Sequence, residues 1–214
     1  MLTYKQSIEK ILQLPFPART ERLPLLNAFG RILAQEIHAP WPTPRYDNSS
    51  MDGFAFHAGD AETAPAHLKL VGESAAGRPF TGTVERGEAI RISTGAKVPE
   101  GLDGIMPVEE TELQDGGNTV VINKPATPGL CIRHRGSDIE EATPIALPGT
   151  AISSAMMMLL TSYNIPEVEV HSRPAVAIIA TGNEVKEHGS HLNETEIVAS
   201  SAYFLKEELE HCQC

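Results

Sequence analysis

Hydrophobic residues recur at helical spacing near both ends of the chain. At the start, Thr3-Tyr4-Lys5-Gln6 has the form of a capping box, and a helix is predicted from there to about Leu14. The apolar residues behind the box share one helical face: Tyr4, Ile8, Ile11 and Leu12. Further helices are predicted over residues 24–29, 151–163 and 200–211.

Between residues 53 and 124 the pattern changes to that of β-strands. Short apolar or alternating runs lie at 54–57, 68–71, 89–92, 105–108 and 119–122, with Gly-rich turn sequences between them. In the first run Phe54 and Phe56 alternate with Ala55 and His57, which predicts a half-buried strand. Strands spaced this closely indicate a small all-β barrel or sandwich.

A continuous apolar run, Val176–Ala180, predicts a strand buried on both faces of a parallel sheet. Thr181-Gly182-Asn183-Glu184 would lie at its carboxyl end, where open α/β sheets bind ligands. One strand and one helix cannot close a core, so we expect this unit to be the beginning of a larger α/β domain that is cut short.

The order of these patterns predicts an α+β multidomain protein. A short strand at 168–170 and the helices flank the β region, so we expect one domain from 1–50 and 138–172, interrupted by an inserted all-β domain, 51–137. Residues 173–214 would form the first βα unit of a doubly wound α/β domain.

The composition limits the classes of partner. The 214 residues carry 28 acids and 17 bases, a net charge of −11, which disfavours nucleic acid and anionic membrane surfaces. No apolar run reaches the ~20 residues that span a bilayer, and the first residues lack a secretory signal pattern. We therefore expect a cytoplasmic protein. Three cysteines form no zinc pattern or disulfide framework.

Two loop sequences contain candidate site residues. Asp52 lies where a polar turn meets the strand at 54–57, a place where a scaffold can expose a reactive carboxylate, although these residues alone favour a role that is limited to capping the turn. Thr94 and Gly95 follow the strand at 89–92, and a hydroxyl beside a backbone amide suits an oxyanion, although Thr-Gly also makes an ordinary turn.

Charged residues give two further candidates. Arg133 and Arg135 lie beside Asp138, and guanidinium groups match phosphate, although an Arg-x-Arg sequence is commonly a solvated face. Glu184 ends the predicted buried strand, where a carboxylate could hold Mg²⁺ or a donor group of a ligand.

An acidic stretch, 98–123, contains no Lys or Arg. Strand alternation would place Glu110 and Glu112 on one face and Glu109 on the other. We expect most of these carboxylates to lie on the surface.

Four motifs together resemble one family. They are Asn-Ser-Ser-Met-Asp-Gly-Phe-Ala (48–55), Ile-Ser-Thr-Gly-Ala-Lys-Val-Pro-Glu-Gly-Leu-Asp (92–103), Arg-Gly-Ser-Asp-Ile (135–139) and Arg-Pro-Ala-Val-Ala-Ile-Ile-Ala-Thr-Gly-Asn-Glu (173–184). In this order and spacing they resemble the molybdopterin molybdenumtransferases, the MoeA family, to which the gephyrin E domain also belongs. The similarity covers essentially the whole chain.

The resemblance implies an elongated first domain, the inserted β domain and an α/β domain that binds molybdopterin. It also implies a homodimer whose active cleft is shared between subunits, and a molybdopterin-adenylylating enzyme as pathway partner. The family's reaction inserts molybdate into adenylylated molybdopterin with Mg²⁺, releases AMP and gives molybdenum cofactor. Carboxylates would serve Mg²⁺, while hydroxyl, amide and Arg donors would hold the anions.

The same resemblance gives the expected site residues. The catalytic set is Asp52, Thr94, Asp138 and Glu184. Substrate contacts are expected from Ser49, Ser50, Gly95, Arg133, Arg135, Thr181 and Gly182. Glu184 and Glu109 are the expected metal ligands.

The chain departs from the family pattern after Glu184. Where the family usually has Asp-Ser-Asn, this chain has Ala199-Ser200-Ser201, and the later motifs of the α/β domain and the C-terminal domain are not in the sequence. An alternative function is therefore a non-catalytic dimerisation or interaction module. A general α/β hydrolase is disfavoured, because the sequence has no nucleophile elbow.

Overall fold

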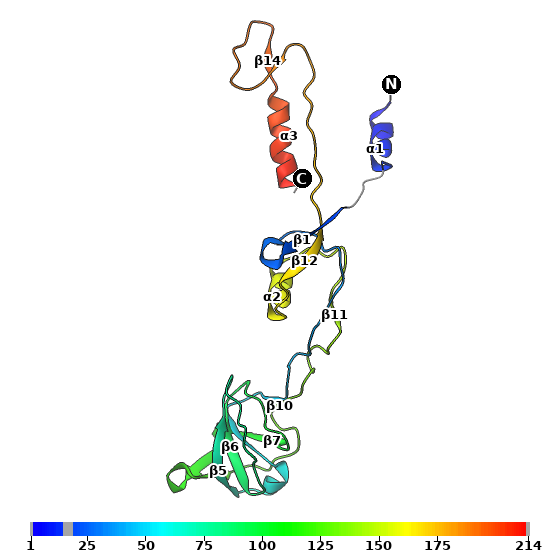
Figure 1. The fold of residues 1–214 in the computed structure, drawn as a ribbon. Coiled ribbons are helices and arrows are strands. Elements are labelled where there is room, and N and C mark those ends of the chain that lie inside the picture. Colours follow the sequence, from blue (N-terminus) through cyan, green and yellow to red (C-terminus); the bar gives the residue numbers. More distant parts are fainter. Residues whose placement is uncertain (1, 15–18, 213–214) are drawn as a thin grey trace. The chain divides into compact units, whose positions relative to one another are not determined.

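The computed structural model describes residues 2–14 and 19–212 (Figure 1). The chain divides into two compact units, Met1–Gln35 with Leu147–Cys214, and Glu36–Ala146. Each unit is treated by itself below. A mixed sheet and a few helices agree with the predicted α+β class. The finer predicted division, with boundaries near residues 50, 137 and 172, stays a prediction.

The second unit is built on a six-stranded sheet in the order β7-β4-β6-β5-β9-β8. Neighbouring strands are antiparallel except β5 and β6, which are parallel with a bulge between Leu70 and Gly72. The strands are β4 (Gly53–Phe56), β5 (Ala66–Ser74), β6 (Glu88–Ile92), β7 (Gly104–Pro107), β8 (Thr111–Gln114) and β9 (Thr119–Ile122). The presence of the strands predicted between residues 53 and 124 is therefore confirmed, and β8 of this sheet was missed.

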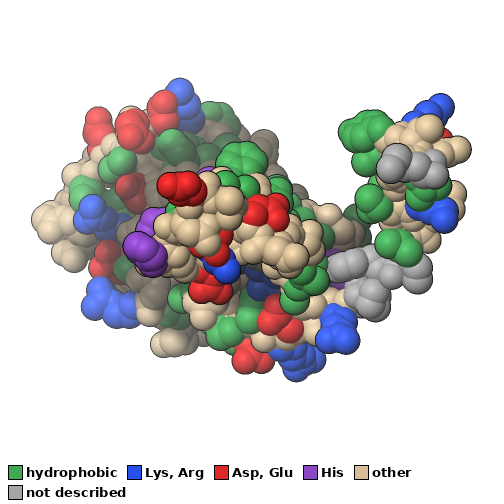
Figure 2. Space-filling model, turned by 90° about the horizontal axis from the view of Figure 1, so that it is seen from above, with side chains coloured by type: hydrophobic (Ala, Val, Ile, Leu, Met, Phe, Trp, Pro, Cys, Tyr) green, Lys and Arg blue, Asp and Glu red, His purple; other side chains and the backbone are tan. Residues whose placement is uncertain are grey.

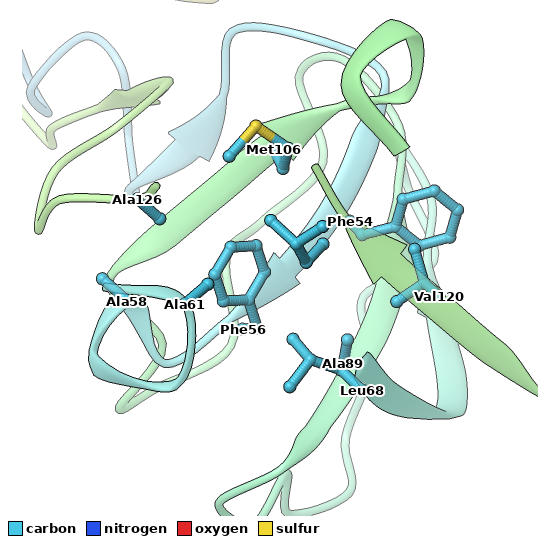
Figure 3. Packing of buried hydrophobic residues seen from close by; sticks show 10 residues of the cluster. Phe54, Phe56, Ala58, Ala61, Leu68, Ala89, Met106, Val120 and Ala126 are labelled. Carbon is cyan, nitrogen blue, oxygen red and sulfur yellow. The ribbon is translucent and has the colours of Figure 1, made fainter. Parts of the chain in front are cut away.

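Hydrophobic side chains cover both faces of this sheet. Figure 3 shows one cluster, in which Phe54 and Phe56 of β4 lie with Leu68 and Val120. Ala55 joins Ile90, Ile92 and Ile105 in a second cluster. The prediction of a half-buried β4 is wrong, since all four of its residues are buried. Hydrophobic clusters pack on both faces of β4, with Phe54 and Phe56 in one cluster and Ala55 in the other, so neither face is left to solvent.

Shorter pairs complete this unit. β2 (Ile37–His38) pairs with β11 (Pro144–Ala146), and β3 (Asn48–Ser49) pairs with β10 (Ile132–Arg133), both antiparallel. Residues 108–110 form a 3-10 helix before β8. The predicted strand alternation of Glu109, Glu110 and Glu112 is therefore wrong, because the first two lie in that 3-10 turn.

In the first unit, β1 (Thr20–Pro24) pairs antiparallel with β12 (Glu167–His171), and α2 (Ser154–Ser162) lies close to a 3-10 turn, Leu25–Asn27. The helix predicted over 24–29 is thus the end of β1 and this short turn. The helices α1 (Tyr4–Leu12), with its capping box, α2 and α3 (Ser200–His211) are confirmed. None of the described helices is long and apolar enough to cross a membrane.

The predicted buried strand at 176–180 is wrong. These residues have no strand structure, and Val176 and Ile179 are 51% and 80% exposed. A strand buried on both faces needs hydrogen-bonded neighbours, and within the described ranges no strand pairs with this segment. The strands that follow this segment are the two-residue pair β13 (Val185–Lys186) and β14 (Ile197–Val198), which are parallel.

Candidate functional site

Three loops of the second unit lie side by side near Asn48. Asn48 pairs with Arg133 on one side through β3 and β10, and with Lys97 on the other side through an isolated bridge. The backbone amide of Gly95 donates to the carbonyl of Ser49 (2.8 Å). The structure therefore brings together three of the motifs found in the sequence, which are separated by about 40 residues each.

Asp52 and Thr94 are in direct contact. Asp52 Oδ1 accepts hydrogen bonds from the backbone amide (2.7 Å) and from the hydroxyl (3.0 Å) of Thr94. Both hydrogen bonds lower the pKa of Asp52 below its ordinary value, and the one from the backbone amide of Thr94 has the larger effect. The carboxylate is therefore ionised at neutral pH. Asp52 thus does more than cap its own turn, because it holds a loop that is distant in sequence.

The backbone conformation after Thr94 explains why the next residue is glycine. Gly95 adopts a φ of +78°, in the left-handed region, and this allows the turn in which Ala96 donates to the carbonyl of Ser93 (2.9 Å). The turn presents the amide and the hydroxyl of Thr94 to the same carboxylate oxygen.

The hydroxyls of Ser49 and Ser50 are used inside the loop. Ser49 is 1% exposed and its hydroxyl donates to the carbonyl of Met51 (2.5 Å). Ser50 donates to the carbonyl of Cys131 (3.0 Å). Both residues hold the Asp52 loop in place, and their expected contact with substrate stays a prediction.

The end of β10 and the loop that follows it carry the candidate arginines, Arg133 and Arg135. Arg133 and Asp138 form an ion pair (2.6 Å) at the surface, and Arg135 pairs with Glu141 (3.2 Å). One contact in this loop was missed from the sequence. Asp47 accepts a hydrogen bond from the Arg135 amide (2.7 Å) and lies 3.1 Å from His134 Nδ1.

Asp47 anchors the loop that carries Arg133 and Asp138. The hydrogen bond from the Arg135 backbone amide lowers the pKa of Asp47. Partial burial of the carboxylate raises this pKa, but by less than the hydrogen bond lowers it. The only signal in the sequence was the position of this aspartate directly before Asn48, which does not reveal a partner that lies 88 residues away.

Thr181, Gly182 and Glu184 belong to the first unit, and all three are exposed. Gly182 has a φ of +138°, and a Cβ at this position would lie 2.7 Å from Glu184 Oε1, so glycine permits the carboxylate to fold back onto the backbone. Because no strand forms at 176–180, these residues do not end a buried strand as predicted.

The two expected metal ligands, Glu109 and Glu184, lie in different units. Across residues 2–14 and 19–212, no group of three or more acidic, histidine or cysteine side chains could hold a metal ion. Glu109 is exposed in the 3-10 turn of the second unit, and Glu184 is in the first unit. Mg²⁺ is commonly held by one or two carboxylates together with substrate phosphates, an arrangement for which Glu184 alone would suffice.

A small hollow lies against the Asp52–Thr94 contact. Its volume is 270 Å³, and it is lined by Asp52, Gly53, Phe54, Arg91, Ile92, Ser93 and Val108. Arg91 was not among the residues expected from the sequence. On the face shown in Figure 2, Lys and Arg side chains are scattered among Asp and Glu side chains. Arg91 therefore gives this hollow a positive charge in a protein whose net charge is negative.

Comparison with known proteins decides the family. The family model for the MoeA N-terminal region (domain I and II) matches residues 2–163. The chain belongs to the MoeA family. It is 35% identical to a molybdopterin molybdenumtransferase of Haemophilus influenzae and 33% identical to one of Synechococcus elongatus, in both cases over 100% of this chain.

Solved structures of MoeA-family proteins have the same fold. A molybdopterin biosynthesis MoeA protein from Pyrococcus horikoshii superimposes with a TM-score of 0.86 over 98% of this chain, at 30% identity. The chain spans about half the length of these relatives: 53% and 55% of the two transferases and 54% of the solved chain. The family resemblance found from the motifs is thus confirmed, and the chain corresponds to the N-terminal part of MoeA-family proteins.

Proposed function

We propose that this chain acts in molybdenum cofactor biosynthesis, as the part of a molybdenumtransferase that helps insert molybdate into adenylylated molybdopterin with release of AMP. The similar proteins from Haemophilus influenzae and Synechococcus elongatus are named molybdopterin molybdenumtransferases. The observation that carries the proposal is the Asp52–Thr94 contact beside the hollow, because it joins two of the motifs on which the resemblance depends.

The second unit offers both an ionised carboxylate and cationic donor groups at these motifs. The hydrogen bonds from Thr94 lower the pKa of Asp52, and within the described chain only the Oδ1 atom of this carboxylate is hydrogen-bonded. Oδ2 is then available to accept a hydrogen bond from a water or a substrate group and to orient it, a positioning role that suits a carboxylate whose lowered pKa makes it a weak base. Arg133, beside Asp138, supplies guanidinium donors for a phosphate on the same unit.

The proposal includes the other expected components of the family's reaction. These are magnesium held by Glu184 and substrate phosphates, a homodimer with a shared cleft, the molybdopterin-adenylylating enzyme as pathway partner, and a cytoplasmic location. Magnesium would polarise a phosphoryl oxygen when bound. The protein residues themselves would bind and orient the anions.

The test is synthesis of molybdenum cofactor from adenylylated molybdopterin and molybdate. We would assay this chain alone, and then mixed with the Haemophilus influenzae relative inactivated in its own N-terminal region. Cofactor and AMP should form in the mixture, and replacing Asp52 by Asn in this chain should abolish them without unfolding the protein.

Asp115 provides a matched control. Its carboxylate also accepts a hydrogen bond from a threonine hydroxyl, that of Thr119 (2.9 Å), in the turn between β8 and β9 and outside the hollow. The Asp115→Asn variant should remain as active as the unmodified chain. If Asp52→Asn supports the same rate of cofactor formation, Asp52 has no part in the chemistry and the proposal fails.

A non-catalytic interaction module is the second candidate. Leu26 and Phe29 in the first unit are 76% and 64% exposed, and Leu25 and Leu26 line a hollow of 220 Å³. Apolar side chains gathered at a surface are typical of a protein contact. This function would be favoured if the chain forms a dimer in sedimentation analysis and yet supports no cofactor synthesis in the mixture.

A further inference from the structure

Arg91 is a cation that no carboxylate approaches within salt-bridge distance in the described part of the chain. It lies in β6, is exposed, and forms no salt bridge among residues 2–14 and 19–212. Several other arginines are neutralised by neighbouring acids, such as Arg133 by Asp138 and Arg86 by Asp60. The charge of Arg91 is therefore available to a ligand.

The sheet holds Arg91 at the hollow. In the register of the sheet Arg91 lies opposite Phe54 of β4, and directly opposed residues of antiparallel strands share a face. Both line the 270 Å³ hollow, together with Asp52 and Ser93. The ring of Phe54 is buried and holds its strand in place beside Arg91, whereas the side chain of Arg91 is exposed.

Charge balance explains why a cation is needed there. Asp52 is ionised, and a second negative charge beside it would be repelled. The hydrogen bonds from Thr94 have the largest effect on the pKa of Asp52, and the charge of Arg91 lowers it further, which places the guanidinium within electrostatic range of the carboxylate. An anion in the hollow would thus meet one negative and one positive group.

We propose that Arg91 binds a tetrahedral oxyanion in the hollow beside Asp52. This inference rests on the proposed function, and it names Arg91 as a substrate-binding residue of the same site. The planar guanidinium offers paired donors to two oxygens of such an anion. A water takes about 30 Å³, so 270 Å³ holds the anion and several waters.

The oxyanion has two sources in the proposed reaction. It is either molybdate or a phosphate group of the adenylylated substrate, and both present tetrahedral oxygens to the guanidinium. Equilibrium dialysis of the 214-residue chain against molybdate, inorganic phosphate and AMP separates these sources. A site for molybdate binds that ion alone, whereas a site for the adenylyl phosphate also binds AMP and inorganic phosphate.

Three variants test the role of Arg91. Arg91→Gln should weaken binding of the preferred anion at least tenfold. Arg91→Lys should give an intermediate affinity, because the ammonium keeps the charge and loses the paired donors. Arg78→Gln is the control, since Arg78 is also exposed and unpaired in the described ranges but lies outside the hollow, and it should bind like the unmodified chain.

Two results would overturn the inference. One is an unchanged dissociation constant in Arg91→Gln when its Trp41 fluorescence shows a folded unit, and the other is no binding of any of the three anions to the unmodified chain. The readout does not involve cofactor synthesis. If Arg91→Gln loses anion binding but the mixture with the relative forms no cofactor, the proposed function is rejected and the role of Arg91 in anion binding is kept.

Discussion

Gly53 couples the fold of the β unit to the position of Asp52. It lies in β4, directly opposite Pro107 of the neighbouring strand β7. A Cβ placed on Gly53 would lie 2.1 Å from the carbonyl oxygen of Met106 and 2.9 Å from its carbonyl carbon. Both are backbone atoms, which cannot rotate away as a side chain would. We therefore expect the variant Gly53→Ala to be strongly destabilised.

The size of the effect follows from these distances. Ordinary contact begins at 3.4 Å, so β7 would have to retreat by about 1.3 Å from β4. Inserting one methyl group into a packed site costs about 1–3 kcal/mol, and a clash with backbone belongs at the upper end. For a domain near 100 residues, about 3 kcal/mol corresponds to a fall in Tm of more than 10 °C.

Urea denaturation followed by tryptophan fluorescence measures this cost in the correct unit. Trp41 is the only tryptophan in the chain and lies in the second unit. The matched control is Gly59→Ala, whose Cβ would meet the guanidinium of Arg86 at 2.9 Å, the far end of a flexible side chain. That variant should lose less than about 1 kcal/mol. Equal midpoints for Gly53→Ala and the unmodified chain would refute the reasoning.

Two further changes test the packing and the electrostatics of this unit. Phe56→Ala removes a fully buried ring and should lower the free energy of unfolding by about 3–5 kcal/mol, read from the same fluorescence transition; a loss below 1 kcal/mol would contradict the assigned core. The folded-state pKa of Asp47 is depressed, so its stabilising effect is present above the ordinary value of 3.8 and is lost as the pH falls through the lower folded-state pKa. The stability difference between the unmodified chain and Asp47→Asn should therefore shrink below about pH 4, and a difference that does not change with pH would show that the carboxylate is not held by the Arg135 amide.

Local signals predicted much of the fold. The capping box at Thr3 and the Gly-rich turns around β9 depend only on residues close in sequence, and the corresponding helix and strand form as expected. The four motifs likewise identified the family, because they combine turn chemistry with fixed spacing. The segment 200–211 matched α3 at both ends.

Errors arose where burial depends on neighbours in space. Phe54 and Phe56 alternate with Ala55 and His57, as on a half-buried strand, yet all four residues of β4 are buried because a hydrophobic cluster packs on each face of the sheet. The run Val176–Ala180 has the composition of a buried strand, but an apolar run becomes one only when other strands satisfy its backbone hydrogen bonds.

The amino-acid sequence by itself determined the helices, most of the strands and the family, since these follow from short-range pattern and motif order. Only the tertiary structure decided which polar groups meet. The contact of Asp52 with Thr94, the bond from the Arg135 amide to Asp47 and the place of Arg91 at the hollow join residues 39 to 88 positions apart. Such contacts depend on strand order and register, which are set by packing of the whole sheet rather than by any one segment.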